Sequence, residues 1–482
     1  MKKSFEKIDY SILSVVLFLL ISIITLFVSP VVGMADNGDF YRVINSNDLY
    51  NLSSNEEENF FGYFNKNYGI FKYNNELEQT LVSTQSIFIK LSVFIDKLMT
   101  RDYIFDIRIL ALIYIIIQAF AIYFITKAIT KDIKNNKYKL LIVMVITFMF
   151  SDTAYIAYYN SFYSEAVSLS CFLFSIGILL YMCRFNKFNI HNLLLFGIST
   201  YLLLGSKQQL LPIGILGSIL MIRIVFLKKD IKVRIISSVL AISFIGSSIY
   251  YYKAIKWDSY YVNKYHSMTR GVLLNEENID EILSEFGIYN QYSILKNEVF
   301  FEDIPMVNPY NERLMQDFYS NYSSFDILLF YIKNPKALIK MTSIVFKNSY
   351  TIRPDGIGNY EKSIGKTYGK KSYFFTLWST IKKGGIPRGL GISLIYIFLF
   401  LIYLIKGYIN SIRLKDKNTL IFYDTVLYSL LIGLSQIIIS IIVIGDADLS
   451  KHLFIYNVSF DLILLIIASS FLQTHNREGS EN

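Results

Sequence analysis

Long apolar blocks alternate with short polar segments over most of the chain. The blocks are about 20 residues long, the length that a helix needs to cross a hydrocarbon core about 30 Å thick, and few of their residues are charged. We therefore predict ten membrane-spanning helices, the fifth of them short because Gly205 ends it. They cover residues 11–33, 103–127, 140–158, 166–183, 189–205, 209–227, 235–252, 389–407, 420–444 and 453–472.

The basic residues of the polar segments predict the orientation of these helices. If the N-terminus is cytoplasmic, the inner segments contain twenty Lys and Arg residues, whereas the three short outer turns contain only Lys207 and Lys451. Because short cytoplasmic loops carry the excess of Lys and Arg, both termini are expected in the cytoplasm. The net charge of +9 therefore reflects topology, and no nucleic-acid partner is expected.

Two long segments, residues 34–102 and 253–388, are expected outside. Residues 83–98 show helical amphipathic spacing that suits a helix lying along the membrane surface, and residues 325–346 resemble them. The apolar face of the first stretch comprises Ile87, Leu91, Phe94, Ile95 and Leu98. We predict an all-α polytopic protein with an N-terminal transmembrane module (1–252), a small helical extracytoplasmic subdomain (253–388) and C-terminal transmembrane helices (389–482).

Composition supports a membrane protein without a disulfide framework. The chain is 53% hydrophobic and only 18% charged, whereas soluble domains are about 25% charged. Its two cysteines, Cys171 and Cys183, both lie in one apolar block. No HExxH or CxxC spacing occurs, so no zinc site built from His or Cys is expected. Asp461 in the last predicted helix and Gln436 in the ninth are the main polar exceptions inside the helices.

An acidic cluster directly follows the first helix. Asp36 and Asp39 lie three residues apart across Gly38, with Asn37 and Arg42 beside them. A partly desolvated carboxylate at the water boundary has a raised pKa and is a better base, and two together could hold a divalent cation. The alternative is an Asp-rich turn, since Asn-Gly and Gly-Asp favour turns.

Two further outer turns carry polar residues. Asn160 and Tyr163 precede Glu165, which is at the start of the fourth helix, and together these polar groups resemble the rim of a pocket. The alternative is that Glu165 only stabilises the helix dipole. Lys207, followed by Gln208, breaks the positive-inside pattern in a turn at the membrane boundary. It is either a snorkelling lysine or a cation that meets an anionic ligand such as a lipid phosphate.

Two clusters late in the chain complete the set. Arg353 offers a planar fork for phosphate or carboxylate, although a solvated loop arginine is the commoner case. The turn from Asp446 to His452 is dense in charge, and for Asp448 we favour self-paired surface charge. All five clusters are far apart in sequence, yet the predicted topology brings them to one membrane face.

Four short motifs carry a family resemblance: NGDFYR (37–42), NSFYSE (160–165), GNYE (358–361) and FTLWS (375–379). They resemble bacterial GT-C membrane glycosyltransferases assigned to hexose transfer onto cell-surface glycans. That family has an acidic motif after the first helix and often a second acid in the next outer loop. The resemblance implies a plasma-membrane enzyme with an extracytoplasmic active site, which transfers a hexose from a polyprenyl-phosphate donor to a glycan or glycolipid with inversion.

The resemblance also implies residue roles. Asp36 or Asp39 would be the base, with Lys207 and Arg353 stabilising the leaving phosphate and Glu165 orienting the acceptor or a metal. The family's acids are usually adjacent or one apart, so the spacing here leaves open which Asp is the base and whether Mg²⁺ or Mn²⁺ binds through Asp36, Asp39 and Glu165. The candidate substrate-binding residues are Asn37, Arg42, Asn160, Tyr163, Lys207, Gln208, Arg353, Asp446 and His452.

Three alternatives remain open at this point. A lipid-linked glycan polymerase or ligase would depend more on outer-loop arginines than on a first-loop acid. A lipid-glycan flippase would need a hydrated passage through the helices, which are strongly apolar. An O-acyltransferase would need an intramembrane histidine, and none stands out.

Overall fold

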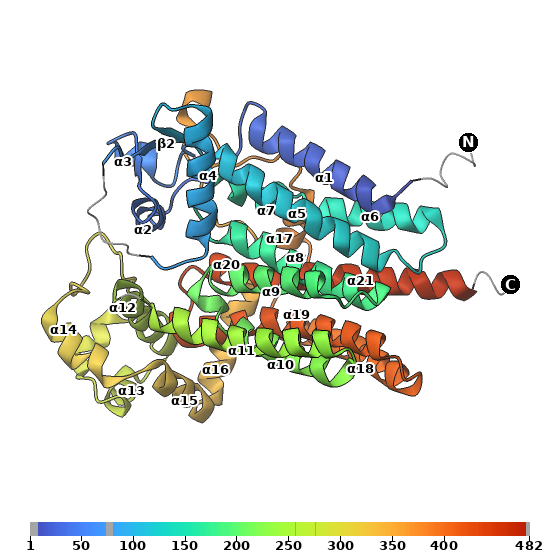
Figure 1. Ribbon diagram of the computed structural model, residues 1–482. Coiled ribbons are helices and arrows are strands. Elements are labelled where there is room, and N and C mark those ends of the chain that lie inside the picture. The colour runs from blue at the N-terminus through green and yellow to red at the C-terminus, as the bar shows by residue number, and fades with distance from the viewer. Residues whose placement is uncertain (1–7, 74–80, 256, 275, 479–482) are drawn as a thin grey trace.

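Long apolar helices packed side by side form the body of the protein (Figure 1). The computed structural model describes residues 8–73, 81–255, 257–274 and 276–478, so Lys2, Lys3 and Lys7 of the orientation argument lie outside the described residues. Within this part of the chain, eight helices are long and apolar enough to cross a membrane. They are α1 (Tyr10–Phe27), α5 (Arg108–Ile129), α8 (Glu165–Phe185), η3 with α10 (Gln208–Leu227), α11 (Ile231–Lys253), α18 (Leu390–Arg413), α19 with η8 (Lys417–Ile444) and α21 (Phe454–Glu478).

The prediction of ten spans is corrected at two places. The third span is a bent pair, α6 (Asn136–Phe150) and α7 with η2 (Thr153–Asn160), which meet at 45° and count as a ninth crossing if taken together. The bend falls where Asp152 accepts a hydrogen bond from the Ala154 N–H and so starts a new helix. The fifth, α9 (Ile190–Leu204), has only 15 residues. In addition, α1 ends at Phe27 rather than Gly33, because Pro30 cannot continue a helix.

Helices that start at the end of the bundle near the two chain termini have side-chain caps. Five helices start there after an Asp or Asn whose side chain accepts a backbone N–H from the first turn, which satisfies a donor that the helix leaves unpaired. These caps are Asp9, Asn135, Asn189, Asp230 and Asp416. In contrast, α8 starts at the opposite end without a side-chain cap, and Glu165 is its first residue.

The first outer segment and the start of the predicted second span contain strands, which the sequence did not predict. β1 (Leu49–Asn51), β2 (Asn67–Ile70) and β3 (Ile104–Asp106) form an antiparallel sheet in the order β1-β2-β3. Two short helices, α2 (Phe40–Asn45) and α3 (Glu56–Asn59), flank it. α4 (Gln85–Met99) runs across the bundle direction (Figure 1).

α4 confirms the predicted amphipathic helix. Ile87, Leu91, Phe94 and Leu98 are exposed, whereas Phe88 and the other residues of the opposite face are buried against the protein. The exposed apolar row and the crosswise orientation suit a helix at the membrane surface.

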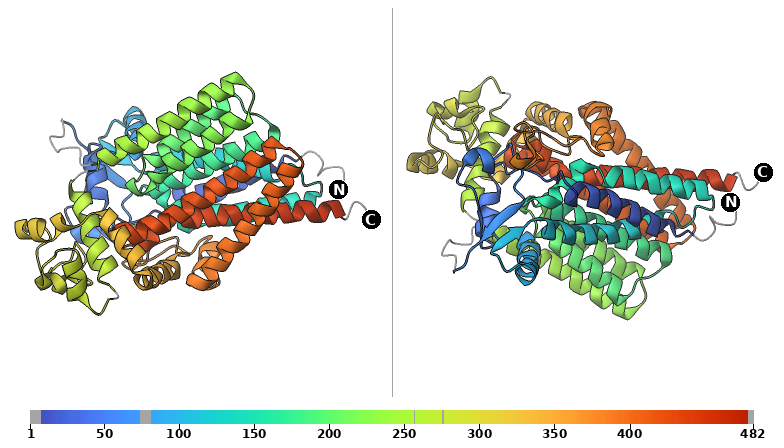
Figure 2. Two further views of the ribbon diagram at one scale, coloured as in Figure 1. Left: turned by 90° about the horizontal axis from the view of Figure 1, so that it is seen from below. Right: turned by 90° about the horizontal axis from the view of Figure 1, so that it is seen from above.

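The second outer segment projects from the same end of the bundle, opposite both termini (Figure 2). Its predicted amphipathic stretch consists of two helices, α15 (Ser324–Lys333) and α16 (Pro335–Asn348), because Pro335 can only start a helix. The other elements of this segment are α12 (Trp257–His266), η4 (Ser267–Val272), α13 (Ile279–Glu285), η5 (Asn290–Leu295), α14 (Glu312–Asp317), η6 (Tyr319–Asn321), η7 (Lys362–Ile364) and α17 (Leu377–Gly384).

A buried ion pair joins α17 to the last helix. The Lys382 Nζ lies 2.8 Å from the Asp461 Oδ1, and both side chains are 0% exposed. The Tyr155 hydroxyl and the Trp378 Nε1–H donate to the other carboxylate oxygen at 2.6 and 2.9 Å. The one acidic residue that stood out in the predicted helices therefore has partners at both oxygens.

Candidate functional site

The loops and turns at the end of the bundle away from both termini (Figure 1) contribute residues that line a cavity of about 790 Å³. Its walls come from the first outer loop, the turn between α9 and α10, the start of α8, α12 and the turn before α21. Nine of the twelve predicted site residues line it. These are Asn37, Asp39, Arg42, Tyr163, Glu165, Lys207, Gln208, Asp446 and His452.

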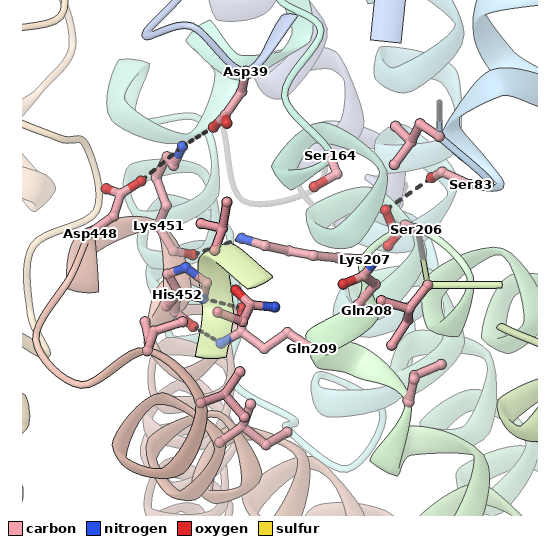
Figure 3. Close-up of a pocket in the computed structure, with 18 of the residues that line it drawn as sticks. Asp39, Ser83, Ser164, Ser206, Lys207, Gln208, Gln209, Asp448, Lys451 and His452 are labelled. Carbon is pink, nitrogen blue, oxygen red and sulfur yellow. Dashed lines mark hydrogen bonds and ion pairs between the residues drawn. The ribbon is translucent and has the colours of Figure 1, made fainter. Parts of the chain in front are cut away.

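Lys451 occupies the centre of the charged network in this cavity (Figure 3). It lies in the short helix α20 (Leu449–His452). Its ammonium group pairs with Asp39 and lies 2.8 Å from the Asp448 carboxylate, and its side chain is only 7% exposed. The Arg42 guanidinium lies 3.2 Å from the other Asp39 oxygen. Burial alone would raise the pKa of Asp39, but Lys451, with Arg42 and Lys207, lowers it to about 2.

Asp36 does not line the cavity but shapes the loop beneath it. Its Oδ1 accepts hydrogen bonds from the backbone N–H groups of Gly38 at 2.7 Å and Phe40 at 3.0 Å, and the residue is 5% exposed. Gly38 has a φ of +99°, which favours glycine at this turn. Burial raises the pKa of Asp36 to about 7, although the two N–H donors oppose the rise.

Asn160 and Tyr163 brace the same loop. The Asn160 Nδ2 donates to the carbonyl oxygens of Leu26 and Val32 at 3.0 and 2.8 Å and lies outside the cavity. The Tyr163 hydroxyl donates to the Ala35 carbonyl at 2.9 Å and accepts from the Asn37 N–H at 3.0 Å. The ring of Tyr163, whose centroid is 5.2 Å from the Lys451 Nζ, also borders the cavity.

A second ion pair joins α8 to the turn before α10. The Lys207 Nζ lies 2.9 Å from the Glu165 Oε1 and 3.4 Å from the Lys451 carbonyl oxygen. Lys207 therefore reaches toward Lys451 across the cavity, as Figure 3 shows.

The side chain of Gln209 holds His452 through two contacts. The Gln209 Nε2 donates to the His452 carbonyl, and the Gln209 Oε1 lies 2.7 Å from the His452 Nδ1. Burial, together with Lys207 and Lys451, lowers the pKa of His452 well below its usual value. The imidazole is therefore neutral at pH 7, with Nδ1 donating to Gln209.

Asp446 forms the third ion pair of the cavity. Arg270 binds it through two parallel contacts of 2.7 and 2.8 Å, the strong fork geometry of a guanidinium and a carboxylate. The backbone of Gly445 passes directly against Arg270: a Cβ atom there would lie 2.1 Å from the Arg270 carbonyl oxygen. This contact docks the second outer segment onto the turn that carries Lys451.

Arg353 lies outside the cavity, in contrast to its predicted role at the leaving phosphate. Its guanidinium donates to the Asn359 side-chain oxygen at 2.6 Å and to the Ser372 carbonyl at 3.1 Å. The Asn359 Nδ2 in turn donates to the Gly33 carbonyl at 2.6 Å. Arg353 thus holds the GNYE motif, and through Asn359 it supports the loop that leads to Asp36 and Asp39.

The three residues predicted to hold a divalent cation each have another partner in the structure. Among the described residues, no group of three or more His, Cys, Asp and Glu could hold a metal ion. Of the three predicted ligands, Asp36 accepts backbone N–H groups, Asp39 pairs with Lys451 and Glu165 pairs with Lys207. Binding of Mg²⁺ or Mn²⁺ therefore stays a prediction, and no step below depends on a metal.

Sequence reasoning missed three groups that the structure brings to the cavity: Lys451, Arg270 and Gln209. Lys451 carried a usable signal, since it was one of only two basic residues in the short outer turns. Arg270 carried none, because nothing in the sequence of a long outer segment indicates which arginine contacts the turn before α21.

An all-helical bundle with eight or nine apolar crossings in the described residues, and with a charged cavity at one end, defines a multi-pass membrane protein with a polar site at the end of its helices. The chain belongs to the family described as the YfdI N-terminal transmembrane domain, whose model matches residues 1–482.

Comparison with other proteins adds one solved structure. The archaeal oligosaccharyltransferase AglB from Archaeoglobus fulgidus, in complex with an inhibitory peptide and a dolichol-phosphate, matches with a TM-score of 0.38 and 12% identity. The match covers 98% of this chain and 52% of that chain, so the chain spans about half the length of AglB. No curated protein matches the chain.

Proposed function

We propose that this protein is a GT-C-type glycosyltransferase that transfers a hexose from a polyprenyl-phosphate donor to a glycan or glycolipid of the bacterial cell envelope. The observation that carries the proposal is the pairing of Asp39 with Lys451, with Lys207 in the same cavity, at the end of a membrane bundle. A carboxylate suits an acceptor hydroxyl, and ammonium groups suit a lipid phosphate.

The reaction is a single displacement. The acceptor oxygen attacks the anomeric carbon from the side opposite the phosphate, which inverts that carbon. The bond between the anomeric carbon and the phosphate oxygen breaks, and its electron pair stays on the phosphate. The acceptor proton moves to the Asp39 carboxylate, while Lys451 and Lys207 stabilise the negative charge that grows on the phosphate.

Asp39 is a better candidate for the base than Asp36. The Asp36 carboxylate is buried and its Oδ1 accepts two backbone N–H groups, whereas the Asp39 side chain is 42% exposed and lines the cavity. A base must reach the proton that it removes. A cation that stabilises the leaving phosphate must likewise lie in the cavity. Lys451 lines the cavity and Arg353 does not, so we assign this role to Lys451 instead of Arg353.

An apolar part of the cavity wall supports a lipid-linked donor. It comprises Leu81, Val82, Tyr251, Tyr252 and Ile255, from the segment before α4 and the end of α11. An isoprenoid chain could leave the charged centre along this wall toward the membrane. α4, whose apolar face is exposed, starts at Gln85 on the lining of this cavity.

The distribution of basic residues supports an extracytoplasmic site in the plasma membrane. Both described ends of the chain lie at the end of the bundle opposite the cavity, and the short basic segments predict that end to be cytoplasmic. The polymerase or ligase alternative would depend on outer-loop arginines. Arg353 holds Asn359 outside the cavity, whereas Arg42 and Arg270 line the cavity and pair with Asp39 and Asp446.

The test uses the purified full-length protein in detergent, with polyprenyl-phosphate-linked hexoses and native membrane glycolipid. Asp39→Asn is expected to lower transfer by about 10²–10⁴-fold, the usual contribution of a general base. The control is Asp355→Asn, an acid that is 70% exposed and lies outside this cavity; it should transfer as the wild type does.

Two results would contradict the proposal. Full transfer by Asp39→Asn would show that Asp39 is not the base. A wild type that transfers nothing from the whole donor panel, yet moves lipid-linked glycan across vesicles, would identify a transporter.

A further inference from the structure

The cavity holds its proposed base and its central cation bonded to each other. Asp39 contacts Lys451 through one carboxylate oxygen and Arg42 through the other. In this arrangement the carboxylate is a weak base, and two of the three N–H groups of the Lys451 ammonium face the carboxylates of Asp39 and Asp448. A donor phosphate must therefore compete with these carboxylates for Lys451.

We propose that the donor phosphate displaces Asp39 from Lys451, so that binding of the donor itself frees the Asp39 carboxylate to accept the acceptor proton. This inference rests on the proposed function, and it adds an exchange of partners at the site. Lys451 and Lys207 are the two cations that receive the phosphate, and Asp39 is the group that leaves.

The surroundings of Lys451 favour movement of Asp39 rather than of Lys451. Lys451 is also held by Asp448 at 2.8 Å and lies against the ring of Tyr163. In contrast, Asp39 stands before the short helix α2 and makes no side-chain capping hydrogen bond there. Its carboxylate is therefore not needed to start that helix.

Arg42 provides a place for the displaced carboxylate. Its NH2 group already lies 3.2 Å from the Asp39 Oδ1, one helical turn further along α2. A rotation of the Asp39 side chain could therefore release Lys451 and keep a charged partner. The carboxylate would then remain at the cavity, where it is already 42% exposed.

The charges of donor and product match this exchange. A sugar linked through a phosphodiester carries one negative charge, so Lys451 exchanges one singly charged partner for another. The lipid phosphate that leaves is a monoester with a second pKa of about 6, and it gains a second charge. Lys207, which contacts the Lys451 carbonyl at 3.4 Å, is the cation in reach of that added charge.

The test measures equilibrium binding of farnesyl phosphate to the full-length protein in detergent, with no sugar or acceptor present. Lys451→Met is expected to weaken binding by about tenfold to a hundredfold, the effect of losing a charged hydrogen bond. Asp39→Asn is expected to tighten binding by roughly twofold to tenfold, because the competing carboxylate is gone. The control is Lys383→Met, an exposed lysine that pairs with Asp355 outside this cavity, and it should bind as the wild type does.

The Asp39→Asn result decides the inference even if Lys451→Met fails to fold. Unchanged or weaker binding by Asp39→Asn would overturn the exchange. Inorganic phosphate should bind more weakly than farnesyl phosphate, since it lacks the chain that contacts the apolar wall. Competition by phosphatidylglycerol at equal concentration would assign the site to ordinary lipid headgroups and overturn a donor site.

The two proposals can fail separately. If Asp39→Asn abolishes hexose transfer but leaves farnesyl phosphate binding unchanged, the glycosyltransferase stands and the exchange is wrong. If binding responds as expected but no donor is used, the lipid-phosphate site stands and the transferase is wrong.

Discussion

Replacing Lys382 by methionine should destabilise the protein far more than the same change at Lys383, the next residue. Lys382→Met removes the ammonium but leaves the Asp461 carboxylate at a position where both side chains are 0% exposed. The hydroxyl of Tyr155 and the indole N–H of Trp378 would remain on one oxygen, and they cannot neutralise the charge.

The structure sets the expected size of this effect. Breaking a buried ion pair by removing one partner costs about 3–5 kcal/mol, because an uncompensated charge stays buried. The Lys383 pair with Asp355 is 50% and 70% exposed, and exposed pairs contribute about 0–1 kcal/mol. Lys382→Met with Asp461→Asn should cost less than the sum of the two single changes, since no charge is then left unpaired.

The assay is thermal unfolding of five purified proteins in one detergent, followed by tryptophan fluorescence and by loss of monodispersity. They are the wild type, the single variants Lys382→Met, Lys383→Met and Asp461→Asn, and the double variant. The unfolding midpoint should fall strongly for Lys382→Met, little for Lys383→Met, and partly recover in the double variant. Equal midpoints for the two single lysine variants would refute the reasoning, because they would mean that the buried pair adds no more than an exposed one.

Three further predictions concern the loop and the docking contact. Asp36→Asn should keep transfer and fold, whereas Asp36→Ala, which loses the acceptor for two N–H groups, should cost about 1–3 kcal/mol in thermal unfolding. The pKa of Asp36 in the folded protein is about 7, above its ordinary 3.8. The free energy of unfolding of the wild type should therefore fall by up to about 4 kcal/mol relative to that of Asp36→Asn as pH rises from 4 to 7. A pH-independent difference between the two unfolding midpoints would contradict this. Gly445→Ala should make the second outer segment more susceptible to protease, since the new Cβ would lie 2.1 Å from the Arg270 carbonyl oxygen. The control is Gly287→Ala, which has open space around it. It should cost only backbone strain of about 1–3 kcal/mol and leave the contact between Gly445 and Arg270 intact.

The helices were predictable because one physical length governs them. The thickness of the hydrocarbon core sets the size of each apolar block, and all ten blocks correspond to helices in the described residues, although α9 and the bent α6–α7 pair fall short of straight crossings. The sheet was not predictable, because β1, β2 and β3 have only three or four residues each. Alternation over so few positions cannot be distinguished from a loop.

The site was predictable as a place but not as a set of bonds. The predicted topology brought the outer turns to one face, and nine of the twelve named residues do line one cavity. The partner of Asp39, however, is 412 residues away along the chain, and no local spacing indicates such a pair. Asn160 lies in one of the four motifs and Arg353 holds another through Asn359, but the hydrogen bonds of both side chains support the first outer loop and neither residue lines the cavity.

The cavity is not an open positive site that waits for an anion, because each carboxylate in it has a cationic partner. Asp39 and Asp448 share Lys451, Glu165 pairs with Lys207, and Asp446 pairs with Arg270. Pairing of this kind lowers the cost of keeping charges at the edge of a membrane. It also means that an anionic ligand gains only the difference between its own contacts and those of the carboxylate that it replaces. Affinity for a lipid phosphate should therefore depend on the acids of the cavity as much as on its lysines.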